Sequence, residues 1–225
     1  AVDMSSCQAQ LEAAHEDGIP IVILDSGVES DDDLVYAYCG TDNKAAGAEA
    51  AKQLCEAIGD EGEVAVMSHI QLSQSSKDRV DGFQEEITKN HPNVRVVSVD
   101  YQLTKDDDPT AEESIEAVLE KYPDLKGYYA TNQATSEAVL SVLDNYSDRS
   151  IKMIGVDMGD TQKKAIEDGK EVGSVCQNPY GMGYATIVAG ARAALELESD
   201  KNIDSGFQWI DKNNIDLEAY ARYLY

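Results

Sequence analysis

The chain has 225 residues, and 42% of them are hydrophobic, so it can bury a sizeable core as one large or two modest domains. Eighteen Lys and Arg stand against 43 Asp and Glu, and the formal net charge of −25 would repel a phosphate backbone or an anionic membrane surface. The composition is that of a soluble globular protein, and it argues against nucleic acid as a partner.

The amino-terminal 18 residues lack the basic start and the apolar run of a secretory signal, so the sequence is either cytoplasmic or already processed. The longest apolar stretch, residues 180–197, is interrupted by Arg192, and it predicts a buried helix rather than a membrane span. Cysteines 7, 39, 55 and 176 are too scattered for a disulfide framework. Buried free thiols are expected, with a single bridge as the alternative.

Strand-like and helical segments alternate along the chain. Apolar runs predict strands over residues 19–25, 34–40, 62–69, 94–101, 126–132, 151–157 and 171–177. Helical spacing, for example at Val80, Phe83 and Ile87, fills most of the intervals. This alternation predicts an α/β protein with parallel sheets flanked by helices. The first run should be buried on both faces, although it ends on a carboxylate.

Other local signals mark helix starts and one more strand. Pro109 followed by "TAEE" predicts one helix start, and Asn178 with Pro179 predicts another. Residues 206–216, which contain the only tryptophan, predict a strand that leads into a short polar segment. The acidic runs 29–33 and 105–109 lack the ligand pattern of a calcium loop and are expected to be solvated loop charge. No metal or cofactor is predicted.

Four predicted strands end on a polar residue. These residues are Asp25, Asn132, Asp157 and Gln177. In open parallel sheets, ligands bind in the crevice beyond the carboxyl ends of the strands. Any one such residue is more often a cap for the next helix, but four of them together favour a ligand site.

Arg79 adds a different kind of signal. It lies near the start of a helix opened by serines, where the helix dipole makes a cation mildly unfavourable and a partner is therefore expected. That partner is either Asp78 or another nearby carboxylate in a surface salt bridge, or a ligand whose oxygens accept from the guanidinium fork.

With these features in place, the chain resembles the type I periplasmic binding proteins that capture sugars for transport, most closely the ribose- and galactose-binding branch. The resemblance rests on six segments in family order: "GIPIVILDSG" (18–27), "GTDNKAAGAEAAKQL" (40–54), "SKDRVDGF" (76–83), "ATNQATSEAVLSVL" (130–143), "IGVDMGDTQKKAIEDGK" (154–170) and "SVCQNPYGMGYATIVAG" (174–190).

The resemblance implies a two-lobed periplasmic-binding-protein-like I fold and a site at which one set of side chains contacts sugar hydroxyls: Asp25, Arg79, Asn132, Asp157 and Gln177. Carboxylates that accept O–H groups, amides that donate and accept, and an arginine fork suit a polyol. The implied first lobe is residues 1–40 with 178–204, and the second is 41–177 with 205–225. Ligand would favour closure of the lobes, and the closed complex would dock on the permease of an ABC transporter.

The sequence departs from the family pattern in two places. Ser26 stands where members often carry an arginine, so one donor to the ligand is missing or comes from elsewhere. Residues 1–14 resemble the end of a later strand and its helix, so the first lobe is expected to be truncated at the amino terminus. The missing part includes the loop that supplies aromatic rings. An extracytoplasmic location follows from the resemblance, with a lipid anchor as one option, and the sugar is not specified.

Two other functions compete with sugar capture. The effector-binding domain of a lac-repressor-type regulator would use the same pocket, but the chain has no basic helix-turn-helix segment. An enzyme is the other alternative. "GMGYAT" imitates a dinucleotide motif, but Thr186 stands at the third glycine position, and His69 has no accompanying nucleophile elbow. A cleft-lining or structural role is expected for His69.

Overall fold

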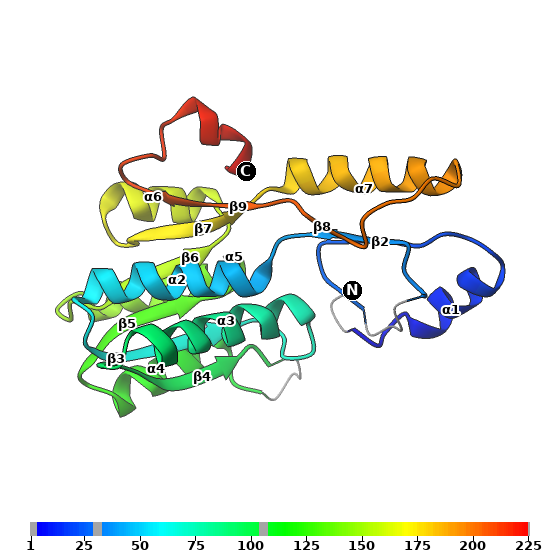
Figure 1. The fold of residues 1–225 in the computed structure, drawn as a ribbon. Helices are drawn as coiled ribbons and strands as arrows, with labels where there is room; N and C mark the ends of the chain where they lie inside the picture. The colour runs from blue at the N-terminus through cyan, green and yellow to red at the C-terminus, as the bar shows by residue number, and fades with distance from the viewer. Residues whose placement is uncertain (1–3, 29–32, 104–107, 225) are drawn as a thin grey trace.

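The computed structural model describes residues 4–28, 33–103 and 108–224, and these residues form two sheets with their helices (Figure 1). The strands are β1 (Val22–Leu24), β2 (Ala37–Gly40), β3 (Gly62–Ser68), β4 (Val94–Tyr101), β5 (Leu125–Ala130), β6 (Lys152–Val156), β7 (Gly173–Gln177), β8 (Asn202–Asp204) and β9 (Phe207–Asp211). The smaller sheet has the order β1-β2-β8, and the larger has the order β4-β3-β5-β6-β7-β9. All pairings are parallel except that of β7 with β9. The predicted α/β class with parallel sheets is confirmed.

The helices are α1 (Gln8–Glu16), α2 (Asn43–Ile58), α3 (Gln74–Asn90), α4 (Ala111–Lys121), α5 (Gln133–Leu143), α6 (Asp160–Asp168) and α7 (Pro179–Ala194), with 3-10 turns at Asp144–Tyr146 and Glu218–Tyr223. Of these, α2 and α3 cover one face of the larger sheet, and α4 and α5 cover the other. The side chains of β3 alternate between the two faces. Val64 and Val66 pack with α2 and α3, whereas Ala65 and Met67 pack with α4 and α5. Burial on both faces explains why these strands are continuous apolar runs in the sequence.

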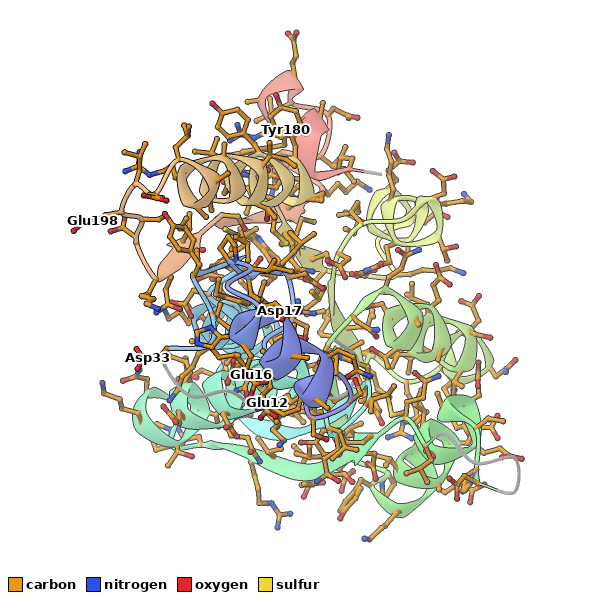
Figure 2. The ribbon with its side chains drawn as sticks, turned by 90° about the vertical axis from the view of Figure 1, so that its right-hand side faces the viewer. Glu12, Glu16, Asp17, Asp33, Tyr180 and Glu198 are labelled. Carbon is orange, nitrogen blue, oxygen red and sulfur yellow. The ribbon has the colours of Figure 1, made fainter. Side chains whose placement is uncertain are left out.

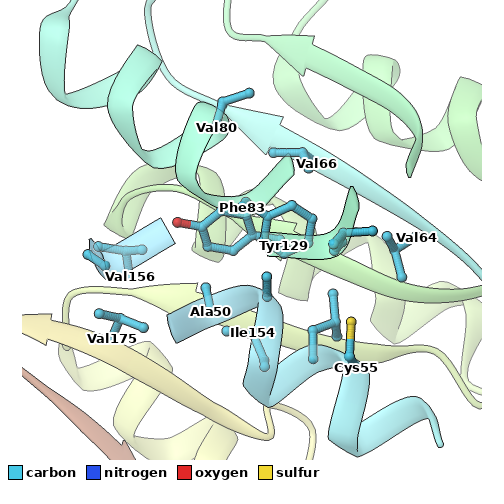
Figure 3. Packing of buried hydrophobic residues seen from close by; sticks show 14 of the residues in the cluster. Ala50, Cys55, Val64, Val66, Val80, Phe83, Tyr129, Ile154, Val156 and Val175 are labelled. Atoms are coloured by element: carbon cyan, nitrogen blue, oxygen red, sulfur yellow. The ribbon is translucent and has the colours of Figure 1, made fainter. Parts of the chain in front are cut away.

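The core between the larger sheet and the α2–α3 pair is tightly filled (Figure 3). Phe83 of α3 stacks on Tyr129 of β5, with ring centroids 4.6 Å apart. Two glycines let the helices touch. A Cβ on Gly47 would lie 2.1 Å from the carbonyl oxygen of Arg79, and a Cβ on Gly82 would lie 2.0 Å from that of Lys44. The two helix backbones are therefore in direct contact, and this contact fixes where Arg79 lies.

The predicted helix starts are close to the observed ones. The Asn178 side chain accepts a hydrogen bond from Gly181 N at 3.0 Å, and Pro179 is the first residue of α7, as predicted. The other start is displaced by one residue, because Thr110 rather than Pro109 precedes α4 and forms a reciprocal capping box with Glu113. The predicted strand at 206–216 is confirmed as β9, which pairs antiparallel with β7.

The first predicted strand is shorter and less buried than expected. β1 has only three residues, and Ile19 and Leu24 are 55% and 47% exposed. The reason is its place in the smaller sheet, where β1 is an edge strand that pairs only with β2 among the described residues. The prediction of burial on both faces is therefore wrong for this run.

The predicted burial of the helix within 180–197 is also wrong. Of the residues in α7, only Met182 and Ala189 are buried, whereas Tyr180 is 72% exposed. The helix packs against the small β1–β2 sheet through Ala185 and Ala189, whereas Tyr184 and Ile187 face outward together with Tyr180. In Figure 2 Tyr180 lies at one edge of the molecule, and the acidic residues Glu12, Glu16 and Asp17 gather around α1.

Three segments of the described chain pass between the two sheets, at residues 40–43, 177–179 and 204–207. They are hydrogen-bonded to one another, since Ser205 N donates to Gly40 O at 2.8 Å and Asn178 Nδ2 donates to Ser205 O at 3.0 Å. Of the two acidic runs, residues 29–32 and 105–107 lie outside the described residues, so their predicted solvation is not addressed.

Candidate ligand-binding site

The polar residues that follow the strands lie at the edge of the larger sheet that faces the smaller one. Asn132 follows β5 by two residues, Asp157 directly follows β6, and Gln177 is the last residue of β7. Asp25 directly follows β1 of the smaller sheet, and Arg79 comes from the second turn of α3. Because parallel strands end at a common edge, the fold brings these segments toward one crevice.

A continuous chain of hydrogen bonds links most of these positions. Gln177 Nε2 donates to Asp157 Oδ1 at 2.7 Å, and Gln177 Oε1 accepts from Thr41 Oγ1 at 3.2 Å. The carbonyl of Thr41 accepts from Asn43 Nδ2 at 3.2 Å. The Asn43 side chain in turn accepts from Arg79. The network therefore runs from the end of β6, through the crossing at residues 40–43, to α3.

Arg79 lies at the centre of this network and is only 3% exposed. Its Nε donates to Asn43 Oδ1 at 2.8 Å, and its Nη1 donates to the carbonyl of Thr131 at 2.7 Å. Both acceptors are neutral, and Asp78 instead accepts from Gln74 at 2.7 Å. The alternative of a surface salt bridge is therefore wrong among the described residues. A buried, rigidly held guanidinium can direct its remaining N–H groups to a ligand oxygen.

Asp25 and Asp157 share an unusual backbone conformation. Their φ angles are 68° and 70°, in the left-handed region that side chains other than glycine rarely adopt, with Asp and Asn among the exceptions. Such a conformation costs on the order of 1 kcal/mol or more and is often found at functional sites. Each Asp ends a strand, so the left-handed turn re-aims the carboxylate at the sheet edge.

The charges of Arg79 and Asp157 both act on the Asp25 carboxyl. Burial raises the pKa of the Asp25 carboxyl, Arg79 opposes this shift, and the negative charge of Asp157 adds to it. Asp25 is nonetheless exposed as a whole residue. The raised pKa and the exposure are both explained by a carboxyl in a crevice, where protein surrounds it but water still reaches it. Two acids and one arginine thus share a single polar region.

The side chain of Asn132 bonds within its own helix start and not to the network that holds Arg79, Gln177 and Asp157. Its Oδ1 accepts from Thr135 N at 3.0 Å and from Thr135 Oγ1 at 2.8 Å, so it caps α5. The neighbouring Thr131 connects this strand end to Arg79 through its carbonyl. The helix-cap interpretation therefore holds for the oxygen of Asn132, and its Nδ2 makes no hydrogen bond within the described residues.

Sequence reasoning missed several residues of this region. Asn43, at the first position of α2, is 5% exposed and holds Arg79, and Thr131 is fully buried. Tyr38 Oη donates to the carbonyl of Asp25 at 2.5 Å. Burial and the charge of Asp25 raise the pKa of the Tyr38 hydroxyl to about 12, so it stays a donor. The one available signal was that a buried arginine requires acceptors nearby.

His69 follows β3 and lies beside the same charges. Burial, reinforced by the positive charge of Arg79, lowers the pKa of its imidazole to about 4, although Asp157 opposes the shift. Its Nδ1 shares a hydrogen bond with Thr131 Oγ1 at 3.2 Å. A neutral imidazole at physiological pH can both donate and accept, which suits the cleft-lining role expected from the sequence.

A cleft of about 760 Å³ opens between the smaller sheet and the starts of α2 and α3. None of the five predicted residues lines it, but three of their partners do: Tyr38, Thr41 and Asn43. The hydrogen-bonded network therefore stands next to a space of the size of a small-molecule site.

A buried polar cluster supports the end of β6 from behind. Gln162 Nε2 and Ser174 Oγ donate to the carbonyl of Asp157, at 3.2 Å and 2.6 Å. Gln162 also lies against Glu171, which is 1% exposed. Burial raises the pKa of Glu171 from its ordinary 4.5 to about 8, although hydrogen bonds from Gln162 and from the Gly155 backbone oppose this. Glu171 is thus held as a neutral acid at pH 7.

We expect the substitution Glu171→Gln to stabilise the protein at neutral pH. The folded state keeps a proton on Glu171 between pH 4.5 and 8, whereas the unfolded state loses it, so the stability of the natural protein falls as pH rises through this window. Glutamine has the shape of the protonated acid but no proton to lose, so the variant avoids the free-energy cost of keeping Glu171 protonated. Urea unfolding should show a gain of about 1–3 kcal/mol at pH 7 and almost none near pH 4.5.

The control for this prediction is Glu167→Gln, an exposed residue in the last turn of α6, the helix that precedes Glu171. It should leave the pH dependence of stability unchanged. A Glu171→Gln protein that loses stability at pH 7 would show that the carboxylate is ionised in the folded state.

The fold and the site together define a class of protein. An open α/β architecture with two sheets joined by three crossing segments, and with polar residues gathered at the facing strand ends, is that of a two-part binding protein for small polar molecules.

Comparison with known proteins gives the family. The family model described as "Periplasmic binding protein domain" matches residues 1–197. The ribose import binding protein of Bacillus subtilis is 25% identical over 181 residues, which are 80% of this chain and 57% of that protein. The D-allose-binding periplasmic protein of Escherichia coli is 28% identical over 179 residues, which are 76% of this chain and 56% of that protein.

Solved structures agree with the sequence relatives. An ABC transporter solute binding protein from Agrobacterium vitis with bound D-fucose is 30% identical, with a TM-score of 0.90 over 99% of this chain and 77% of that one. Another protein of that description, from the same organism and bound with α-D-tagatopyranose, is 25% identical, with a TM-score of 0.89 over 99% and 77%. The chain belongs to the periplasmic binding protein domain family, as the resemblance implied.

Two further findings concern the length of the chain and its helices. The chain spans a little over half the length of the curated relatives that it matches. Of the helices in the described residues, none combines the length and apolar content required to cross a membrane.

Proposed function

We propose that this protein binds a monosaccharide or a similar small polyol at the strand-end site and delivers it to an ABC-type sugar permease, without chemical turnover. The observation that carries the proposal is the hydrogen-bonded chain from Asp157 through Gln177, Thr41 and Asn43 to Arg79. It holds a carboxylate, an amide and a guanidinium in fixed positions beside the Asp25 carboxyl. A sugar hydroxyl both donates and accepts, so it pairs with all three kinds of group.

The charges of the site favour a neutral ligand over an anionic one. Asp25 and Asp157 outnumber Arg79 in the site, and neither carboxylate forms an ion pair within the part of the chain that the structure describes. An anionic ligand would face their repulsion, whereas a neutral polyol can donate O–H groups to them. The relatives whose structures contain fucose and tagatopyranose support this choice of ligand class.

We further propose that residues 1–40 with 178–204 move as one lobe and residues 41–177 with 205–225 as the other. The three crossings at 40–43, 177–179 and 204–207 would then be the hinge. Away from these crossings, Ser26 Oγ shares a hydrogen bond with Ser73 Oγ at 3.3 Å, which joins the end of β1 to the start of α3. Ligand contacts from both lobes would stabilise the closed state.

The location of the protein belongs to the same proposal. A protein that supplies a permease acts outside the cytoplasm, and the relatives' names include a periplasmic protein. A lipid anchor is compatible with this role. The acidic surface around Glu12, Glu16 and Asp17 (Figure 2) offers charge for docking to a basic permease surface.

The test is a thermal-shift screen with the protein expressed from its complete gene. The panel holds neutral aldopentoses and aldohexoses, with amino acids and sugar phosphates as charged controls. A matching sugar at about 100 times its Kd should stabilise the folded state by about 3 kcal/mol, raise Tm by several degrees and be recovered unchanged. Stabilisation by a charged control alone, or release of a product, would contradict the proposal.

A further inference from the structure

Side chains that can bind a transition metal meet where α2 and α3 end. Cys55 lies in the last turn of α2, Asp60 follows that helix, and His91 is the residue that ends α3. One ligand atom from each of these three residues lies within 4.8 Å of the other two. The cluster is at the opposite end of the helix pair from Asn43, so it is separate from the strand-end site.

His91 is held in place but incompletely bonded. Its side chain is only 17% exposed, although the sequence placed it beside an exposed helical segment. Nδ1 lies 2.5 Å from Asp60 Oδ1. Nε2 is enclosed, makes no hydrogen bond and lies 3.7 Å from Glu86 Oε1. A histidine that binds a metal through one ring nitrogen commonly donates the N–H of the other to a carboxylate, so Nε2 can face Glu86 while Nδ1, beside Asp60, is the nitrogen that would ligate an ion.

Cys55 brings sulfur to the same place. Its thiol is free and fully buried at the edge of the core, and its sulfur is visible in Figure 3. The cluster therefore combines sulfur with an imidazole nitrogen and a carboxylate oxygen.

We propose that Cys55, Asp60 and His91 form a binding site for one zinc-like divalent ion, with Glu86 on the other side of the His91 ring as the carboxylate that orients the imidazole. Sulfur, imidazole nitrogen and carboxylate oxygen at about 2.0–2.3 Å are the ligands of tetrahedral zinc, whereas magnesium and calcium select oxygen alone. In such a site the ligand atoms lie roughly 3–4 Å apart. The exposed Asp60 side chain can move inward to meet this geometry.

Binding also has a defined proton balance. The ion replaces the proton of the Cys55 thiol, so a sulfur–metal bond forms, the S–H bond breaks, and one proton passes to water. The affinity must therefore rise with pH. A bound ion would join the carboxyl-terminal ends of α2 and α3, whose amino-terminal halves carry Asn43 and Arg79.

The test is zinc titration by calorimetry of the protein from its complete gene, reduced and freed of metal with a chelator. We expect one zinc ion per chain with a Kd in the micromolar range or below. The observed binding heat should vary linearly with the ionisation heat of the buffer, with a slope that corresponds to the release of about one proton. Cadmium, used as a second probe, should produce an ultraviolet thiolate-to-metal band. Cys55→Ser should abolish that band and weaken zinc binding by at least about 10-fold.

Matched variants make the outcome decisive. Cys39→Ser replaces another buried thiol, and His15→Gln replaces an exposed histidine, so both should retain full zinc binding. His91→Gln and Asp60→Asn should weaken binding as Cys55→Ser does, which guards against misfolding of any single variant. No saturable zinc binding by the natural protein, or binding that Cys55→Ser leaves intact, would overturn the proposal.

Discussion

Replacing Gly47 by alanine is expected to destabilise the protein by about 3 kcal/mol or more. The added Cβ would lie 2.1 Å from the carbonyl oxygen of Arg79, an atom of a helix backbone that cannot rotate away. The α2 and α3 backbones would have to separate by about 1 Å along a fully packed core, and overpacking of this kind typically costs 1–3 kcal/mol or more. Helix propensity alone would favour the substitution by about 1 kcal/mol, so the sign of the result identifies the cause.

The matched control is Gly190→Ala, also a glycine inside a helix. Nothing lies within 4 Å of a Cβ built on Gly190, so this variant should be stabilised slightly by the gain in helix propensity. Urea unfolding followed by circular dichroism measures both variants. Equal effects of the two substitutions would show that α2 and α3 are not in backbone contact in solution.

The separation of these helices matters beyond stability. Arg79 is on α3 and its acceptor Asn43 is on α2, so a shift between the helices lengthens the 2.8 Å hydrogen bond that joins them. We therefore expect Gly47→Ala to weaken ligand binding in proportion to the loss of this bond. The glycine acts by setting a distance, not by touching a ligand.

The larger sheet was predictable from the sequence because burial on both faces leaves a plain pattern. β4 matches the predicted range of residues 94–101, β3, β6 and β7 lie within their predicted runs, and β5 begins one residue before its run. A strand covered by helices on two sides, such as β3, reads as a nearly continuous apolar run. The same pattern misled for β1, where an apolar run belongs to a sheet edge.

α7 shows a related limit. Its apolar residues correctly predict a helix, but the sequence does not record which of them another element covers. Ala189 packs on the smaller sheet, whereas Tyr180 and Ile187 face outward. Burial depends on neighbours that are far away in the chain, and periodicity carries no information about them.

For the candidate site, the expectation that ligands bind beyond the carboxyl ends of parallel strands located the residues. It did not predict the hydrogen bonds between them. Asp157 and Gln177 are hydrogen-bonded, although 20 residues separate them. Asn43 was missed because a polar residue at a helix start is usually a cap, and Thr131 was missed because it acts through its backbone carbonyl, which every residue has. The roles of all five predicted residues in ligand binding stay predictions.

Removing the Asp157 carboxylate should have the largest effect on ligand affinity. In Asp157→Ala, the Gln177 amide loses its acceptor, in addition to the lost bond to the ligand. Loss of a charge-assisted bond together with an unpaired polar group costs about 3 kcal/mol, or roughly two powers of ten in Kd. Calorimetry with the sugar identified by thermal shift, on the protein from its complete gene, measures this directly.

Two further variants separate charge from backbone geometry. Asp157→Asn retains an oxygen acceptor and tolerates the φ of 70°, so we expect a smaller loss of about 10-fold that reports the charge alone. Asp168→Ala removes an exposed carboxylate that pairs with Lys164, and it should leave affinity unchanged. Unchanged affinity in Asp157→Ala would show that Asp157 does not contact the ligand. Equal losses in Asp157→Ala and Asp157→Asn would instead assign the whole effect to charge, because the asparagine keeps both the shape and the left-handed turn.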